Sequence, residues 1–195
     1  MPGSTNTVKK VKAGIATIDC NLITIETESG EFGFDTANKI SVEPQTEEEE
    51  AVKLIIKGVL RAQKPKQVTV TGNEITLTDN VFTPELVLIL QGGEIVYDTE
   101  THKIIEGYNP PTAGSTDKGA LFKLNAYSAQ YDASGQIVQY EKITYPNCQG
   151  QPVAFSSEDG AFRAPEYTIS SAPKTGERPY EIRYVKTLPE LQDAE

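Results

Sequence analysis

The chain has 195 residues, a length that fits one domain with terminal arms. Its formal net charge of −10 argues against a surface that binds nucleic acid tightly, because such binding needs basic groups that displace counterions. Nine tyrosines, 15 glycines and 12 prolines favour strands and turns over helices. Cys20 and Cys148 lie far apart without a CxxC spacing, which predicts two thiols in a reducing compartment rather than a disulfide framework or a zinc site.

Residues 1–12 are polar and basic, and we expect them to form a flexible N-terminal arm. This segment holds Lys9, Lys10 and Lys12 and no acidic residue, whereas the last six residues include three acids. The opposite signs indicate either that the two ends meet between neighbouring copies or that both are ordinary solvated termini. Neither a secretory signal nor a stretch of about 18 apolar residues is visible, so we expect synthesis in a cytoplasm and no membrane span.

The segment from residue 13 to 34 predicts two short strands that end at a turn at Ser29-Gly30. The next segment is ambiguous. Thr46 and Glu49 have the spacing of a helix capping box, but Gly58 and the β-branched residues before it favour a hairpin. We favour a hairpin that turns near Lys57-Gly58, with Glu47 to Glu50 at the exposed end of its first strand.

The stretch "QVTVTGNEITLTD" alternates apolar and polar residues, which is typical of half-buried strands, and we expect Gly72-Asn73 to turn the chain between two of them. A short helix follows at Pro84–Gln91. Thr83 suits the N-cap, Pro84 the first helical position, and Gly92 a left-handed C-cap. Its nearly all-apolar sequence predicts that it packs against a sheet, a neighbouring subunit, or both.

Four further strands complete the predicted domain. "ALFKLNAYSAQY" and "GQIVQYEKITYP" alternate and pair across a turn at Asp132–Gly135, and two proline-flanked strands follow. The pattern predicts a mainly β fold, an antiparallel β-sandwich or barrel with one flanking α-helix, an extended hairpin and terminal arms. We assign residues 13–188 to this single domain and residues 189–195 to a C-terminal arm.

The sequence offers no catalytic motif. The single histidine, His102, lies in a polar stretch that is typical of an exposed loop, and phosphate-binding glycine motifs and calcium-loop spacings are absent. Carboxylates are numerous enough for a paired-carboxylate glycosidase, but such sites usually also carry aromatic platforms for sugar rings, and the absence of Trp weakens that alternative. We therefore expect no catalytic residue, no cofactor, no metal and no enzyme activity.

The order of several motifs resembles that of a known family. "ITLTDNVFTPELVLILQGG", "GYNPP", "YEKITYPNCQG" and "DGAFRAPEYTISSAPKTGERPYEIRYV" follow one another between about Lys39 and Leu188 as in the tail-tube proteins of phages and phage-like particles of Gram-positive bacteria. Each motif alone is only a turn, a cap or a strand, and the resemblance rests on their joint order and spacing.

This resemblance implies a β-sandwich that forms hexameric rings, which stack into a tube for DNA passage, or for puncture in a genome-free particle. It implies that the helix, Pro84–Gln91, lies across the outside of the sandwich. It also implies that the hairpin, roughly Glu48–Pro65, and the arms, residues 1–12 and 189–195, bridge subunits or rings. The implied partners are further copies of the chain and other tail proteins: tape measure, baseplate or tail tip, terminator and sheath. The implied location is a virion tail assembled in the host cytoplasm.

Two sets of candidate residues follow from the strand pattern and the resemblance. The candidates for the tube lumen are the polar sides of the alternating strands: Glu74, Thr76, Thr78, Lys123, Asn125, Gln139 and Glu141. The candidates for contacts between subunits or rings are Lys9, Lys10, Lys12, Glu47, Glu48, Glu49, Glu50, Leu86, Val87 and Leu90. The competing hypothesis is a monomeric β-sandwich ligand-binding module, such as a carbohydrate-binding domain, favoured by the Tyr and Asn content of the loops.

Overall fold

The computed structural model describes residues 14–116, 118–155, 158–160 and 163–192. Within them the chain forms twelve strands and one helix. The elements, in chain order, are β1 (Thr17–Thr27), β2 (Gly30–Phe34), β3 (Ala37–Glu49), β4 (Val52–Ile56), β5 (Val59–Lys64), β6 (Gln67–Asp79), α1 (Pro84–Gln91), β7 (Glu94–Tyr97), β8 (Ile105–Asn109), β9 (Phe122–Tyr131), β10 (Ile137–Gly150), β11 (Glu166–Ser171) and β12 (Glu181–Val185).

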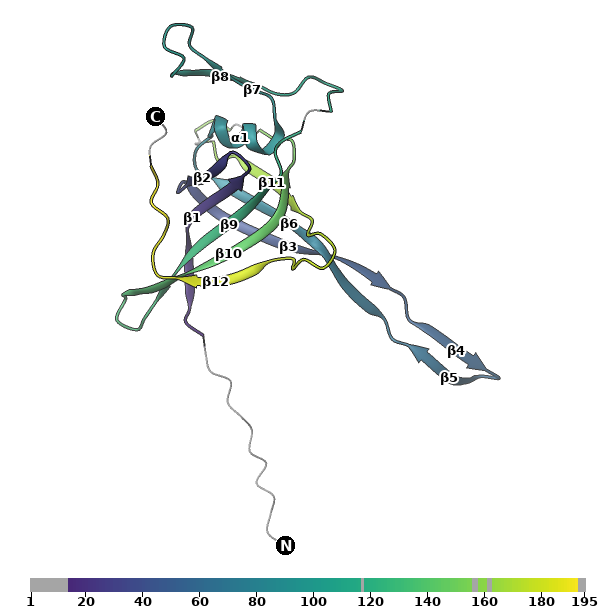
Figure 1. Ribbon diagram of the computed structural model, residues 1–195. Helices are drawn as coiled ribbons and strands as arrows, with labels where there is room; N and C mark the ends of the chain where they lie inside the picture. The colour runs from purple at the N-terminus through teal and green to yellow at the C-terminus, as the bar shows by residue number, and fades with distance from the viewer. Residues whose placement is uncertain (1–13, 117, 156–157, 161–162, 193–195) are drawn as a thin grey trace.

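Eight strands form one antiparallel sheet that folds over itself (Figure 1). The strand order is β2-β1-β9-β10-β11-β6-β3, and β12 pairs with β10 beside this path. The 14-residue strand β10 is where the sheet divides, because its middle pairs with β12 and its last residues pair with β11. The result is two layers, β2-β1-β9-β10-β12 and β11-β6-β3, so the predicted mainly β sandwich with one flanking helix is confirmed.

The core lies between the two layers and follows from the alternation of each strand. Side chains of one parity point inward from both layers and from α1, and their neighbours point outward. Fifteen buried residues form one apolar cluster: Ile23, Ile25, Ala37, Ile75, Leu77, Leu86, Val87, Leu90, Phe122, Leu124, Ala126, Tyr145, Cys148, Tyr167 and Ile169.

Helix α1 closes one end of this core. Leu86, Val87 and Leu90 are at most 2% exposed, and Gly92 ends the helix with φ 81° and ψ −156°, a positive φ but not the left-handed helical region that the sequence predicts. Thr83 occupies the N-cap in an extended conformation, but its side chain makes no capping hydrogen bond. The helix is therefore stabilised mainly by packing rather than by its caps.

Two glycines let the rest of the chain approach α1 closely. A Cβ atom added at Gly119 would lie 2.2 Å from the carbonyl oxygen of Leu90, and one at Gly150 would lie 2.5 Å from the same oxygen. Ala120 also donates its backbone N–H to the carbonyl oxygen of Ile89. The last turn of the helix is thus enclosed by backbone from two distant segments.

Two sequence predictions about strand limits are wrong. Gly72 and Asn73 do not form a turn; they lie within β6, a continuous strand of 13 residues with a register irregularity opposite Gln45. A Cβ at Gly72 would lie 2.4 Å from the carbonyl oxygen of Ser171, so close contact with β11 explains this glycine. Likewise the segment before Ser29 forms one bulged strand, β1, rather than two strands, with Asp19 at φ 65° in the bulge.

Two hairpins project from the sandwich at different places (Figure 1). Strands β4 and β5 join through Lys57 and Gly58, both with positive φ, which is the two-residue type I′ turn. This confirms a hairpin rather than a helix in the ambiguous segment, although Glu47 to Glu49 belong to the end of β3 and not to β4. Strands β7 and β8 form the second hairpin, beyond α1.

Candidate assembly surfaces

The hairpin β4–β5 exposes apolar side chains on both of its faces. Val52, Leu54, Ile55, Ile56, Val59 and Leu60 are between 47% and 64% exposed. Leu54 and Ile56 lie on one face and Ile55 and Leu60 on the other, because successive residues of a strand alternate. A two-stranded ribbon cannot bury either face by itself, and an isolated hairpin of this kind is only marginally stable in water.

The ribbon between this hairpin and the sandwich is also exposed. Here the end of β3 pairs with the start of β6, and Val68 and Val70 are 55% and 46% exposed. Glu48 forms an ion pair with Lys66, and Glu49 forms one with Lys64, all four side chains being about half exposed. Such surface ion pairs contribute only about 0–1 kcal/mol each, so they give the ribbon register rather than stability.

The outward face of β11-β6-β3 is an open polar surface. Glu74, Thr76 and Thr78 alternate with buried Ile75 and Leu77 and therefore point away from the core. Their cross-strand neighbours complete the surface: Lys39, Ser41, Glu43, Glu166, Thr168 and Ser170. Three carboxylates against one lysine make it acidic, and Glu43 stands directly opposite Glu74, a like-charge pair that costs stability.

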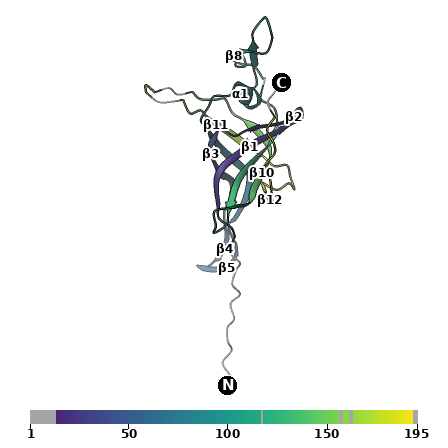
Figure 2. The same ribbon diagram turned by 90° about the vertical axis from the view of Figure 1, so that its left-hand side faces the viewer.

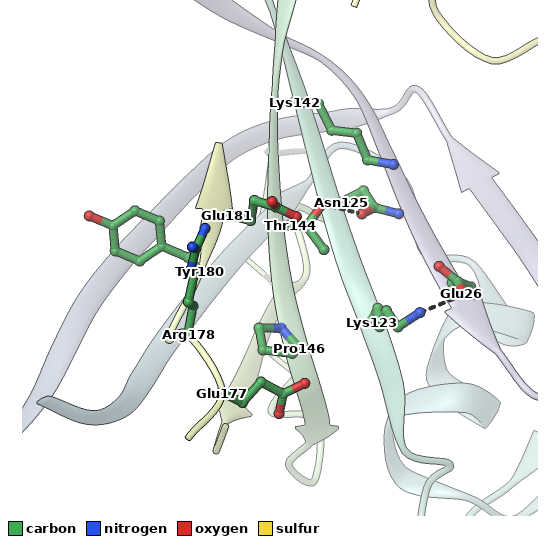
Figure 3. A pocket seen from close by; sticks show the side chains of 10 residues that line it. All are labelled: Glu26, Lys123, Asn125, Lys142, Thr144, Pro146, Glu177, Arg178, Tyr180 and Glu181. Carbon is green, nitrogen blue, oxygen red and sulfur yellow. Dashed lines mark hydrogen bonds and ion pairs between the residues drawn. The ribbon is translucent and has the colours of Figure 1, made fainter. Parts of the chain in front are cut away.

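The outward face of the other layer carries a polar cleft of about 360 Å³ (Figure 3). Lys123, Asn125, Lys142 and Thr144 come from β9 and β10, and Glu26 comes from β1. The chain between β11 and β12 completes the wall with Glu177, Arg178 and Tyr180. Lys123 and Asn125, two of the lumen candidates, thus lie in a cleft partly walled by their own chain.

Several polar groups of this cleft are already paired within the chain. The Asn125 amide donates to the Thr24 hydroxyl at 3.0 Å and accepts from the Thr144 hydroxyl at 2.8 Å. Lys123 lies 2.8 Å from the Glu26 carboxylate, and this hydrogen bond raises the pKa of the lysine. A hydrogen bond from Arg183 lowers the pKa of the Glu181 carboxyl. These pairs leave the cleft with fewer groups to recognise a ligand than its composition suggests.

The structure does not bring the seven lumen candidates together. Glu74, Thr76 and Thr78 share one outward face, whereas Lys123 and Asn125 lie on the outward face of the opposite layer. Gln139 and Glu141 alternate with Tyr140 and Lys142 and share the parity of Ile143, which packs on the core. Gln139 donates to the side-chain oxygen of Gln130 at 2.8 Å, so both residues belong to the inner face of their layer.

The candidate contact residues also separate into groups. The structure buries Leu86, Val87 and Leu90 in the chain's own core, so their side chains are not available to a neighbouring subunit, which corrects that prediction. Glu47 to Glu50 are exposed on the ribbon that leads to β4–β5. Lys9, Lys10 and Lys12 lie outside the described residues.

Three strands of the described sheet present unpaired edges in addition to the hairpin. Strands β2 and β3 end the sheet on its two sides, and β12 pairs only with β10 among the described strands. Ile182 and Tyr184 on β12 are 46% and 59% exposed. Free strand edges with exposed apolar side chains are the surfaces through which β-proteins associate.

The described residues contain no cluster of three or more His, Cys, Asp or Glu side chains that could hold a metal ion. His102 is exposed in the turn between β7 and β8. Burial raises the pKa of the Cys148 thiol to about 11 and also raises that of Cys20, which keeps both thiols protonated at neutral pH. Within the same part of the chain, the one helix is too short to cross a membrane.

Comparison with known proteins gives only distant structural likeness. No family model matches the chain, and no curated protein matches it in sequence. One similar solved chain comes from the sheath–tube complex of PVC, an extracellular contractile injection system, in its extended state, with 12% identity, a TM-score of 0.38, and coverage of 87% of this chain and 92% of that chain. Another comes from the baseplate of the anti-feeding prophage, AFP, with 8% identity, a TM-score of 0.33, and coverage of 92% and 98%. Because both TM-scores lie below 0.5, neither likeness defines what this chain does.

Proposed function

We propose that the chain is the structural subunit of a tail tube, in a phage or a phage-like particle, and that copies of it associate into hexameric rings that stack around a channel. The observation that carries this proposal is the hairpin β4–β5, which exposes six large apolar side chains on two faces. The ring and the tube are inferred from the order of sequence motifs, which resembles that of tail-tube proteins.

The energetics favour a partner for this hairpin. Complete burial of a Val, Leu or Ile side chain contributes about 1.5–3 kcal/mol, so covering six half-exposed side chains offers several kcal/mol to an assembled state. The ribbon also extends far from the domain, beyond reach of the chain's own core (Figure 1). In a closed ring every copy has a neighbour, and that neighbour can cover the apolar side chains of the hairpin. Pairing between neighbours in such a ring would also leave no strand edge exposed.

The acidic outward face of β11-β6-β3 is the better candidate for the channel wall. DNA passes most freely over a surface that makes no attractive contacts with phosphate, and this face holds Glu43, Glu74 and Glu166 with Thr and Ser between them. The opposite outward face carries a cleft in which Lys123, Lys142 and Arg178 stand beside Glu26, Glu177 and Glu181, so it offers basic groups that phosphate can contact. We therefore assign Glu74, Thr76 and Thr78 to the lumen and place Lys123 and Asn125 away from it.

The remaining parts of the proposal follow from its role in a tail. Tubes of this kind end at other proteins, so the partners are tape measure, terminator and baseplate or tail-tip proteins, and a sheath if the tail contracts. The location is then the tail of an assembled particle, with synthesis and assembly in the bacterial cytoplasm.

The test is assembly of the purified chain. Negative-stain microscopy and sedimentation velocity at rising protein concentration are expected to show rings or tubes. The substitution pair Ile55→Asp and Leu60→Asp places charge on the apolar hairpin and is expected to leave a folded monomer. Ile104→Asp is the matched control, because Ile104 is 64% exposed on the other hairpin turn.

Two results would overturn the proposal. The first is a wild-type chain that stays monomeric at every concentration, particularly if it is stabilised by a sugar in a thermal-shift screen. The second is normal assembly of the hairpin variant, which would show that the exposed apolar side chains are not at a contact.

A further inference from the structure

A groove of about 570 Å³ lies beside the start of α1. Its apolar lining includes Phe32, Phe34 and Ile89, and Leu191 of the C-terminal segment forms one side. Phe32 is 44% exposed and Leu191 is 47% exposed, so the floor is not covered by the described chain.

The rim of this groove is acidic. Glu31 on β2, Glu85 in the first turn of α1 and Glu190 in the C-terminal segment line it, and no described Lys or Arg does. The fit of the C-terminal segment is close, because a Cβ added at Gly33 would lie 2.4 Å from a methyl carbon of Leu191. Three segments from distant parts of the sequence therefore build one apolar trough with a negative rim.

One segment of this chain has the complementary chemistry. Within residues 1–13, Lys9, Lys10 and Lys12 are cationic, Val8 and Val11 are apolar, and no acidic residue is present. A segment of this length reaches at most about 45 Å when extended. Its charge and its two valines match the acidic rim and apolar floor.

The placement of the segment indicates which copy it reaches. Strand β1 begins at the end of the sandwich opposite α1 and β2, in both views of the molecule (Figures 1 and 2). The groove lies at the α1 end, since β2, α1 and the C-terminal segment form it. A second copy placed end to end with the first brings its groove next to the origin of this segment, whereas the chain's own groove lies at the far end of its own domain.

We propose that residues 1–13 of one copy dock in the groove between β2, α1 and Glu190–Gln192 of the next copy along the tube. This contact rests on the proposed self-assembly, and it would connect copies along the axis of the tube. In it the lysines pair with Glu31, Glu85 and Glu190, and the valines cover the apolar floor. It also gives a physical role to the opposite charges of the two chain ends.

The experiment uses the full chain with Phe32 replaced by the photo-crosslinking amino acid p-benzoylphenylalanine. Equal amounts of ¹⁴N- and ¹⁵N-labelled protein are mixed before assembly, irradiated, and the crosslinked peptides identified by mass spectrometry. We expect crosslinks from position 32 to residues 1–13 that combine the two labels. The same amino acid at Tyr180, in the polar cleft, is the control and is expected to give none to that segment.

Charge reversal tests the rim. Lys9→Glu, Lys10→Glu and Lys12→Glu together are expected to lower the yield of the mixed-label crosslink about tenfold, because three partly exposed ion pairs are lost. Adding Glu31→Lys, Glu85→Lys and Glu190→Lys is expected to restore most of that yield. Lys103→Glu, on the loop between β7 and β8, is the matched single reversal and is expected to have no effect.

The outcomes of this experiment distinguish failure of the docking contact from failure of the proposed tail-tube function. Crosslinks that combine one label only would show that the segment docks on its own chain, and would overturn the contact between copies. Tubes that form without any crosslink from position 32 to residues 1–13 would overturn the docking site and leave the proposed function intact. Mixed-label crosslinks in assemblies that are not tubes would support the docking site and overturn the tube. A chain that stays monomeric and gives no crosslink would overturn both.

Discussion

Two segments of nearly the same composition differ in burial in this protein: one lies in the core and the other is exposed. Helix α1 contains "ELVLIL" and buries Leu86, Val87 and Leu90 almost completely, whereas the hairpin β4–β5 contains "VKLIIKGVL" and leaves every residue exposed. The helix lies against two layers of sheet, whereas no described part of the chain covers the hairpin. Apolar content therefore does not tell where the core is; whether a second surface is available decides it. Under the proposed function, another copy of the chain supplies that surface to the hairpin.

The largest expected difference between the two segments is in stability. Leu90→Ala removes a fully buried side chain and is expected to lower the free energy of unfolding by about 2–5 kcal/mol, through lost burial and the cavity left behind. Ile55→Ala in the hairpin is expected to change it by less than about 0.5 kcal/mol. Denaturant unfolding of dilute protein measures both. Equal losses for the two variants would mean that the hairpin is covered in the isolated chain.

The close approach around α1 can be tested at a single glycine. Gly150→Ala would place a Cβ 2.5 Å from the Leu90 carbonyl oxygen and is expected to cost about 1–3 kcal/mol, because the backbone on both sides has to move. Gly107→Ala is the control: its added Cβ would have its nearest neighbour at 4.0 Å, an ordinary contact. Thermal unfolding should separate the two, and an unaffected midpoint for Gly150→Ala would show that the helix is loosely held.

The two cysteines should report the same contrast through their reactivity. Cys148 is fully buried, and burial raises its pKa to about 11. Cys20 is partly exposed, and burial raises its pKa as well. In native protein we expect Cys20 to react with a thiol reagent at least about tenfold faster than Cys148, which must wait for the core to open. Absorbance of the released chromophore, with Cys20→Ser to identify each phase, measures this. Comparable native rates would contradict a closed core.

The smallest expected effect concerns the second hairpin, β7–β8. Asp98 accepts hydrogen bonds from the backbone N–H groups of Thr101, Lys103 and Ile104, and these bonds lower its pKa from 3.8 to about 2. A carboxyl with a lowered folded pKa stabilises the loop above its unfolded value, and this contribution is lost as pH falls through the folded value. We therefore expect amide exchange at these three residues to accelerate between about pH 4 and pH 2, after correction for intrinsic rates.

Asp98→Asn tests whether the carboxylate is responsible. This variant should show the fast loop exchange already at neutral pH, with no change in the thermal midpoint, because the loop is exposed. Asp132→Asn, at another turn with an aspartate cap, is the control for a general effect of lost charge, since the Asp132 carboxylate accepts from the backbone N–H groups of Ser134 and Gln136, outside this loop. A loop whose exchange does not respond to pH would contradict the assigned hydrogen bonds.

Sequence patterns succeeded where the relevant forces are local. The strand pair β9 and β10 around Asp132–Gly135, the helix beginning at Pro84, and the Lys57-Gly58 turn all depend on alternation or on residues with special φ preferences, which neighbours in sequence specify. They failed at Gly72, because a glycine inside a strand is indistinguishable from a turn glycine until the contact with Ser171 is known. They left open whether a sheet or a neighbouring subunit covers Leu86, Val87 and Leu90, because the surface that covers them is set by the whole fold.

The candidate surfaces show the same division. Alternation in each strand correctly separated the outward Glu74, Thr76 and Thr78 from their buried neighbours, but it assigned no layer to a strand. Only the folding of the sheet at β10 places Lys123 and Asn125 on the opposite side and turns Gln139 and Glu141 inward.

The amino-acid sequence by itself determined the class of this protein: acidic, mainly β, with one short helix, one apolar hairpin and ends of opposite charge. Those properties depend on composition and on residues close together in the chain. The tertiary structure alone decided which apolar segment is covered, which polar faces point the same way, and that β2, α1 and the C-terminal segment meet at one groove. These outcomes depend on contacts between residues far apart in sequence, and no local pattern encodes them.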